Sequence, residues 1–263
     1  MSDFENAANE SAPKFESSSQ EHFLNFAFPG DEEPGAINGR KFEFPGVNSL
    51  YQSDEIDNYD CSKHDCGEGK VCYCHYELNV PYDQTIQMVW VNKGSGAGWG
   101  HPIHMHGHSF YVVKMAYAPQ NKTTGLIADT QFNGSLGENQ DINCSNTNGL
   151  RFCNNATWAN SEWSGDNLPG INTINPPRKD TLIIPTGGYA VIRIRTNNPG
   201  KWFLHCHVEE HMLDGMAMII NEASDRFPDP PPGFPICQNF YNDPTRDLSY
   251  IRSQPSTSTY YYS

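Results

Sequence analysis

Histidines gather in two short segments of this chain, and this distribution constrains its fold more than any other feature. Seven of the ten histidines lie within residues 101–108 and 205–211. The second segment begins with His205-Cys206-His207 and follows a strand-like run at 189–196. Side chains alternate between the two faces of an extended strand. His205 and His207 are therefore expected on one face and Cys206 on the other, so that one strand serves two metal sites back to back.

The upstream segment, His101-Pro-Ile-His104-Met-His106-Gly-His108, obeys the same alternation. His104 and His106 share a face, whereas His101, an odd number of residues away, favours the opposite face. Pro102 biases the preceding backbone towards an extended conformation. Two groups of side chains are therefore predicted to converge. The first is a cluster of four imidazoles, and the second combines two imidazoles with one thiolate: His104, His106, His205 and His207; and His101, Cys206 and His211.

The second group indicates copper. Two histidines and one cysteine with a weak axial methionine form the ligand set of blue-copper electron-transfer centres. Met216 stands ten residues after Cys206 and is the candidate axial ligand, and Gly215 allows a tight turn before it. The four-imidazole group suits copper, zinc, iron or nickel equally well. Two other interpretations remain open: a zinc site, since zinc binds His and Cys at short spacings, or histidines that bind no metal.

These residues resemble the C-terminal copper motifs of multicopper oxidases, and most closely those of the animal laccases. The family pattern is HPxHxHGH, followed about a hundred residues later by HCHxxxH and an axial position; here it spans His101 to His108 and His205 to Met216. The segments 175–181 and 198–204 also resemble the family, and the likeness runs from about residue 37 to 239. It implies an all-β fold, a cupredoxin-like Greek-key β-sandwich with long loops.

The resemblance also implies a role for each candidate ligand. His101, Cys206, His211 and Met216 would bind the type 1 copper. His104 would bind the type 2 copper, and the type 3 pair would be bound by His106, His205 and His207. The covalent path from Cys206 to His205 and His207 would carry electrons between the sites, which makes these three the catalytic residues. His108 belongs to the motif without being a ligand.

The implied activity is the one-electron oxidation of phenols or aromatic amines, coupled to reduction of dioxygen to water. The family's trinuclear cluster takes half of its histidines from an N-terminal cupredoxin domain, and no such pairs precede His101. The chain is therefore expected to own the type 1 site and half of a type 2/type 3 site. Alternatives are an isolated electron-transfer domain, a truncated product, a homodimer that pools both half-sites, and an oxidase of ferrous or cuprous ions. Glu209 and Glu210 keep the metal-oxidase alternative open, although an exposed acidic pair needs no function.

Composition limits the partners and the compartment. The chain carries 17 basic and 31 acidic residues, a net charge of −14, which argues against nucleic acid and anionic membranes as partners. No stretch is long enough to span a membrane. Five Asn-X-Ser/Thr sequons and eight cysteines favour a secreted glycoprotein with disulfides. The sequons are Asn9, Asn121, Asn133, Asn143 and Asn155. No secretory signal opens the chain, so we expect a fragment of a secreted protein.

The pattern along the chain predicts three parts: a linker or remnant of a preceding domain at 1–24, the copper-binding domain at 25–225, and a Pro/Ser-rich tail at 226–263. Short strands are expected at 21–28, 85–92, 109–115, 180–184, 189–196 and 217–220, with an Asn-Gly turn into a further short strand at 37–44, assembled as an antiparallel sandwich. Residues 119–170 are predicted to form a polar surface insertion, with a possible Cys144–Cys153 disulfide. The clustered Cys61, Cys66, Cys72 and Cys74 favour disulfides over a metal, and Cys237 is left over.

Overall fold

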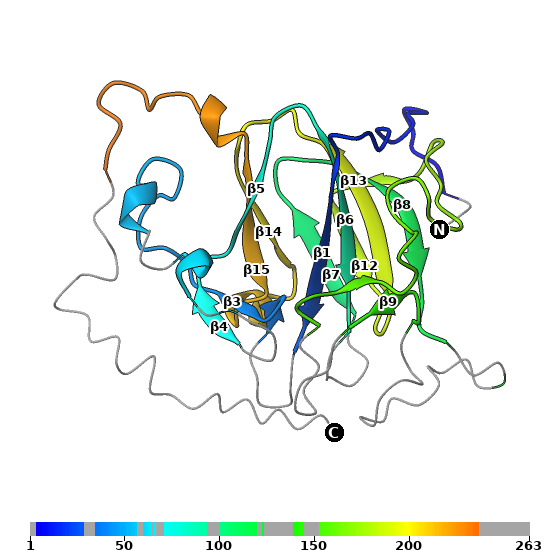
Figure 1. Ribbon diagram of the computed structural model, residues 1–263. Coiled ribbons are helices and arrows are strands. Elements are labelled where there is room, and N and C mark those ends of the chain that lie inside the picture. The colour runs from blue at the N-terminus through cyan, green and yellow to red at the C-terminus, as the bar shows by residue number, and fades with distance from the viewer. Residues whose placement is uncertain are drawn as a thin grey trace.

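The computed structural model describes residues 4–28, 35–56, 60–64, 66, 71–93, 100–119, 123, 139–144 and 153–236. Within these ranges the regular structure is nearly all β, arranged as two facing sheets (Figure 1). The larger sheet holds, in spatial order, β11 (Arg178–Lys179), β8 (Phe110–Ala116), β13 (Tyr189–Arg195), β6 (Thr85–Val91), β1 (Gln20–Ala27), β2 (Ala36–Ile37), β3 (Arg40–Phe42) and β4 (Cys72–Cys74). The smaller sheet holds β12 (Thr181–Ile184), β7 (His101–Met105), β14 (Gly200–Cys206), β15 (Ala217–Glu222) and β5 (Glu77–Val80).

Short elements complete the fold. Strands β9 (Ile142–Asn143) and β10 (Thr157–Trp158) form a separate pair, and one short helix, α1 (Glu209–Leu213), follows β14. Single 3-10 turns lie at Ser53–Glu55, Cys61–Lys63 and Ser224–Arg226. Among the described residues no helix has the length and hydropathy to cross a membrane.

The predicted two-sheet sandwich is confirmed, but its strands are not all antiparallel. β1 pairs in parallel with β6, β15 with β5, and β3 with β4. Parallel neighbours need long connections, and such pairings cannot be read from the local alternation that predicted the strands. The short strands β4, β5, β9, β10 and β11 were also not expected, because runs of two to four residues carry little periodic signal.

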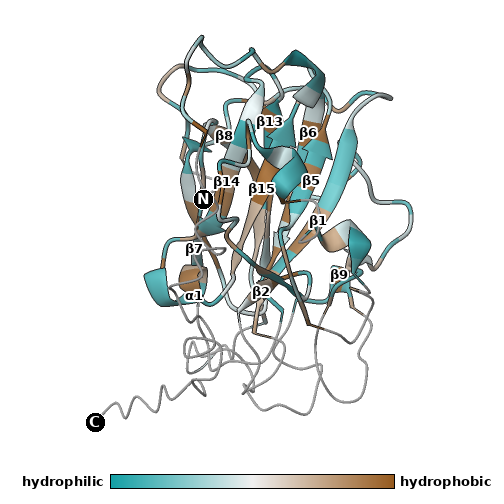
Figure 2. Ribbon diagram, turned by 90° about the vertical axis from the view of Figure 1, so that its left-hand side faces the viewer, coloured by the Kyte–Doolittle hydropathy of each residue, from teal (hydrophilic) through white to brown (hydrophobic). Residues whose placement is uncertain are grey.

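The main core lies between the two sheets and is built from one face of each strand. Trp90 is fully buried at its centre, with its ring 4.8 Å from that of Phe110 and 6.0 Å from that of Phe26, both edge-on. In Figure 2 the apolar colour concentrates along β6, β13 and β15. Alternate residues of β7 are buried: His101, Ile103 and Met105. The candidate ligand His101 therefore lies on the face of β7 that contributes to the main core.

A second cluster covers the outer face of the larger sheet, where a polar surface insertion was predicted. Trp158 packs edge-on against Tyr189 with ring centroids 5.5 Å apart, and Ala12, Ile142 and Leu168 are buried beside them. The predicted Cys144–Cys153 disulfide is present. Its sequons Asn143 and Asn155 are exposed, whereas Asn121 and Asn133 lie outside the described residues. The apolar residues of the insertion are sparse, so its sequence did not show that it covers a sheet.

The N-terminal segment also differs from the predicted linker. The boundary expected between residues 24 and 25 lies inside β1, and Asn6 donates a side-chain hydrogen bond to the Pro176 carbonyl at 2.9 Å. A few contacts suffice to place this polar segment against the sheet, and composition does not reveal them. Of the predicted tail, residues 226–236 are described and largely exposed, while Cys237 and the remainder lie outside the described residues.

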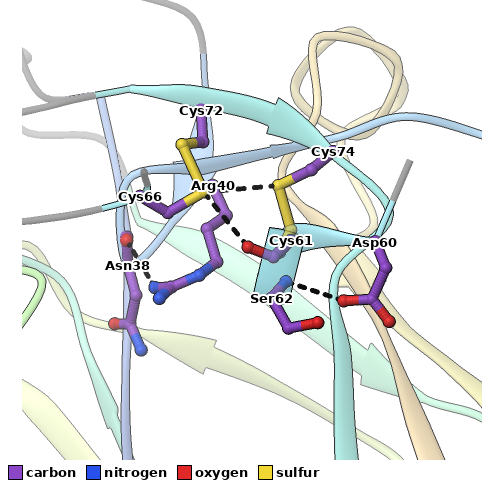
Figure 3. Close-up of a disulfide and its surroundings, with 8 residues drawn as sticks. All are labelled: Asn38, Arg40, Asp60, Cys61, Ser62, Cys66, Cys72 and Cys74. Carbon is purple, nitrogen blue, oxygen red and sulfur yellow. Dashed lines mark hydrogen bonds between the residues drawn. A yellow bond between two sulfur atoms is a disulfide. The ribbon is translucent and has the colours of Figure 1, made fainter. Parts of the chain in front are cut away.

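The early cysteines form disulfides, as predicted, and the structure pairs Cys61 with Cys74 and Cys66 with Cys72. Figure 3 shows the two bonds side by side, with Cys66 Sγ 3.8 Å from Cys74 Sγ. They tie β4 to the preceding turn, and β4 in turn pairs with β3. No thiol of this cluster is left to bind a metal.

Glu77 on β5 ties three elements together. It accepts hydrogen bonds from His75 at 2.8 Å, Lys201 of β14 at 2.6 Å and Asn221 of β15 at 3.1 Å. Burial by itself would raise the pKa of Glu77, but the hydrogen bonds from His75 and Lys201 outweigh it and hold the pKa below its usual value.

We expect Glu77→Gln to lose stability in a pH-dependent way. A carboxylate whose folded pKa is depressed stabilises the fold above its unfolded pKa, and this stabilisation is lost as the pH falls through the folded pKa. The difference in unfolding free energy between wild type and variant should therefore shrink on acidification below about pH 5. Urea unfolding at several pH values measures it, and a difference independent of pH would contradict the assignment.

Candidate metal centre

Three side chains from β7, β14 and α1 meet at one end of the sandwich, on its inner face. Cys206 Sγ lies 3.7 Å from His101 Nδ1 and 3.6 Å from His211 Nδ1, and the two nitrogens are 3.2 Å apart. His101 ends up here because β7 pairs with β14 in the register Met105 to Leu204 and Ile103 to Cys206. The donor atoms of the three residues all lie within 4.8 Å of one another, close enough to share one ion.

This trio is buried, and burial sets its protonation. Burial, reinforced by the neighbouring His211, lowers the pKa of His101 to about 3, and burial also lowers the pKa of His211. Both imidazoles are therefore neutral at physiological pH, as metal ligands must be. Burial raises the pKa of the Cys206 thiol to about 11. The thiol therefore keeps its proton until a cation takes its place, and ion binding should release one proton.

Met216 lies beside this trio. Its side chain is fully buried, and its carbonyl accepts a hydrogen bond from the Cys206 N–H at 3.0 Å. Phe28, at the end of β1, closes another side, with its ring edge-on to His211 at 5.0 Å. Soft sulfur and neutral imidazole donors in a water-excluding pocket fit a copper ion well.

The other four histidines lie together on the opposite, outer face of the smaller sheet. Their ring centroids are 4.8 Å apart for His104 and His106, 5.4 Å for His106 and His205, and 5.6 Å for His205 and His207. His106 Nε2 comes within 3.3 Å of His205 Nε2. The structure thus brings together both groups that alternation predicted, one on each side of β14.

Backbone carbonyls orient two of these rings. His104 Nδ1 donates to the Asp180 carbonyl at 2.9 Å, and His205 Nδ1 donates to the Cys206 carbonyl at 2.9 Å. Each bond assigns the ring proton to Nδ1 and leaves Nε2 as the metal donor, the usual arrangement around metal-bound histidine. Phe203 stacks on His205 with centroids 4.6 Å apart. His106 and His207 are exposed, so this group forms an open patch on the sheet surface.

His108 was not predicted to bind a metal, and its contact with Glu222 was not predicted from the sequence. His108 pairs with the fully buried Glu222 of β15 at 2.5 Å, and Glu222 also accepts the Asn198 N–H at 2.7 Å. Asn198 in turn donates to the Gly107 carbonyl at 2.9 Å, which ties the end of the first histidine segment to the turn before β14. Glu209 and Glu210 are exposed at the start of α1.

Known proteins are similar to this chain in sequence. The family model "Multicopper oxidase" matches residues 46–142 and 144–226, most of the chain. "Laccase-7" from Oryza sativa subsp. japonica is 30% identical over 224 residues, which cover 79% of this chain and 32% of that protein. "Iron multicopper oxidase fer1" from Mycosarcoma maydis is 26% identical over 223 residues, 85% of this chain and 26% of that protein. The chain thus spans about a third or less of the length of these relatives.

Solved structures show the same fold at low identity. The laccase from Botrytis aclada superposes with a TM-score of 0.52 at 19% identity, covering 87% of this chain and 32% of that one. Fet3p, described as a multicopper oxidase that functions in iron import, gives 0.51 at 20% identity, with coverage of 83% and 34%. The fold is therefore the predicted cupredoxin-like sandwich. The relatives include plant laccases and fungal enzymes, and a closer tie to animal laccases stays a prediction. This chain belongs to the multicopper oxidase family.

Proposed function

We propose that the chain is the C-terminal copper-binding portion of a secreted, laccase-like multicopper oxidase, with residues 25–225 as its cupredoxin domain. The enzyme would oxidise phenols or aromatic amines one electron at a time and reduce dioxygen to water. One observation carries the proposal. On β14, Cys206 faces the imidazoles of His101 and His211, while the adjacent His205 and His207 face those of His104 and His106.

In this proposal the inner trio and Met216 hold the type 1 copper, which when bound accepts and passes on single electrons. The pocket supplies two neutral imidazoles and excludes water. The substrate would approach near α1, where the exposed Glu209 and Glu210 directly precede the buried His211. An exposed carboxylate there could accept the proton that a phenol releases on oxidation.

The outer patch would hold half of the type 2/type 3 site, with His104 for type 2 and His106, His205 and His207 for type 3. Peptide bonds join Cys206 directly to His205 and His207, so electrons have a short covalent route between the two faces of β14. The remaining histidines would come from N-terminal cupredoxin domains. We therefore expect the 263-residue chain alone to hold type 1 copper without consuming dioxygen, as an electron-transfer domain would.

A metal oxidase is the second candidate. Two observations favour it: the exposed carboxylates of Glu209 and Glu210 next to His211, and the similarity to an iron multicopper oxidase. Carboxylate oxygens suit hard cations. With the N-terminal domains present, comparing ferrous ion with a diphenol as electron donor separates the two activities. Faster oxidation of ferrous ion that falls in Glu209→Gln/Glu210→Gln would favour the metal oxidase.

Copper content and spectra test the proposal directly. The purified chain, loaded with copper, should hold one tightly bound ion per inner trio and show an intense blue band with a type 1 EPR signal. Oxygen uptake should appear only when a longer chain supplies the missing histidines. A colourless protein that prefers zinc would overturn the blue-copper assignment, and a copper-bound protein with no blue band would overturn the role of Cys206.

Met216→Leu tests the axial position. A thioether donor stabilises the oxidised ion, so its loss should raise the reduction potential of the blue centre. Redox titration followed at the blue band measures the shift, with the EPR signal as a check that the site remains type 1. An unchanged potential would show that Met216 does not act on the copper.

A further inference from the structure

Strand β3 contacts the segment that carries two candidate ligands, residues 211–216, which we call the ligand loop. The Phe42 N–H donates to the Gly215 carbonyl at 2.9 Å. Gly215 has φ +116°, and a Cβ at this position would lie only 2.2 Å from Lys41 Cγ. A glycine is therefore needed both for the backbone conformation and for the close approach of the strand. The loop that carries His211 and Met216 is thus held from outside by a strand of the other sheet.

Asp214 makes the second connection. Its Oδ2 accepts a hydrogen bond from the Gly35 N–H at 2.6 Å, and its Oδ1 pairs with Lys41 Nζ at 3.3 Å. Gly35 itself covers the metal-binding candidates: a Cβ on it would lie 3.5 Å from Met216 Cε and 3.4 Å from the His211 carbonyl oxygen. The Asp214 carboxylate therefore ties the ligand loop to the backbone segment that closes over Met216.

The partner of the ligand loop is itself anchored. β3 pairs with β4, with Lys41 opposite Tyr73 and Phe42 opposite Cys74. β4 carries one cysteine of each early disulfide, and Figure 3 shows these bonds packed beside Arg40 of β3. The two disulfides restrict the motion of β4, and β3 is paired with β4. β3 can therefore hold the ligand loop in a fixed position.

We propose that Asp214 is a positioning residue, which locks the ligand loop to Gly35 and β3 and thereby sets where His211 and Met216 stand relative to Cys206. This proposal rests on the proposed type 1 copper site for its consequence, but not for the lock itself. The backbone hydrogen bond to Gly35 should matter more than the Lys41 pair, because the Asp214 side chain is 37% exposed and exposed ion pairs contribute little.

The copper-free chain tests the lock. In Asp214→Ala, amide hydrogen exchange at Phe42 and Met216 should accelerate by about tenfold, the factor for losing a hydrogen bond to a charged group. Asp214→Asn keeps an oxygen for the Gly35 N–H and should fall between Asp214→Ala and wild type. Glu210→Gln is the matched control, since it removes a neighbouring carboxylate that forms no hydrogen bond or ion pair with β3, and its rates should stay within about twofold of wild type.

The copper-loaded chain tests the consequence. Asp214→Ala should change the EPR splitting and the relative intensities of the visible bands, because the positions of the ligands change. Glu210→Gln removes the same charge near His211 and should shift only the reduction potential. Identical spectra and exchange rates for the two variants would overturn the proposal and reduce Asp214 to a surface charge. Faster exchange in Asp214→Ala without any blue copper in wild type would support the lock and refute the proposed copper function instead.

Discussion

Cys206→Ser should abolish the blue band of the copper-loaded chain completely. The serine hydroxyl does not ionise at neutral pH, so the inner trio loses its only thiolate and with it the covalent bond that defines a blue-copper centre. Copper binding at this face should weaken by at least about tenfold, since soft thiolate is the donor that selects copper here. Visible absorption, EPR and copper analysis after dialysis measure the three effects.

The control must separate lost ligation from lost folding. Cys206 is fully buried in the main core, so a hydroxyl there would cost about 1–3 kcal/mol unless it bonds to one of the two imidazoles. Cys206→Ala avoids that cost and should lose the blue band equally. Far-UV circular dichroism and the unfolding midpoint of each variant show whether the sandwich persists. A folded Cys206→Ala protein that stays blue would exclude Cys206 as the copper ligand.

Glu222→Ala should cost the fold about 2–6 kcal/mol, because it leaves two hydrogen-bonding groups without their acceptor, at about 1–3 kcal/mol each. Glu222 is fully buried and accepts hydrogen bonds from both His108 and the Asn198 N–H. Its removal therefore leaves two groups without their acceptor. Urea unfolding of the copper-free chain measures the loss. Glu209→Ala is the matched control, because that carboxylate is exposed and should change stability by no more than about 0.5 kcal/mol.

A double-mutant cycle with His108→Ala isolates the pair itself. If His108 and Glu222 act as a unit, the double variant should be destabilised by clearly less than the sum of the single variants. Additive losses would mean that Glu222 acts through Asn198 alone. Coupled losses would give His108 a structural role through Glu222, which would account for a histidine of the copper motif that binds no metal.

The sequence by itself divided the candidate ligands into two groups. Alternation along a strand depends only on local backbone geometry, so the separation of Cys206 from His205 and His207 followed from their adjacency. The same local rule located β6, β8, β12, β13 and β15 with errors of a residue or two. The predicted Asn38-Gly39 turn is also found between β2 and β3. Both residues take positive φ, as a two-residue hairpin requires.

Only the tertiary structure decided which segments meet. Placing His101 against Cys206 requires β7 and β14 to be neighbours in one register, although about a hundred residues separate them. The same holds for four other features: the parallel strand pairs, the apolar cluster on the outer face of the larger sheet, the His108–Glu222 pair, and the contacts of β3 with Asp214 and Gly215. Each of these features depends on contacts between segments that are far apart in the chain. The free energy of such contacts depends on how all the segments pack together. No local pattern encodes such contacts, whereas the alternation of side chains along a single strand is encoded locally.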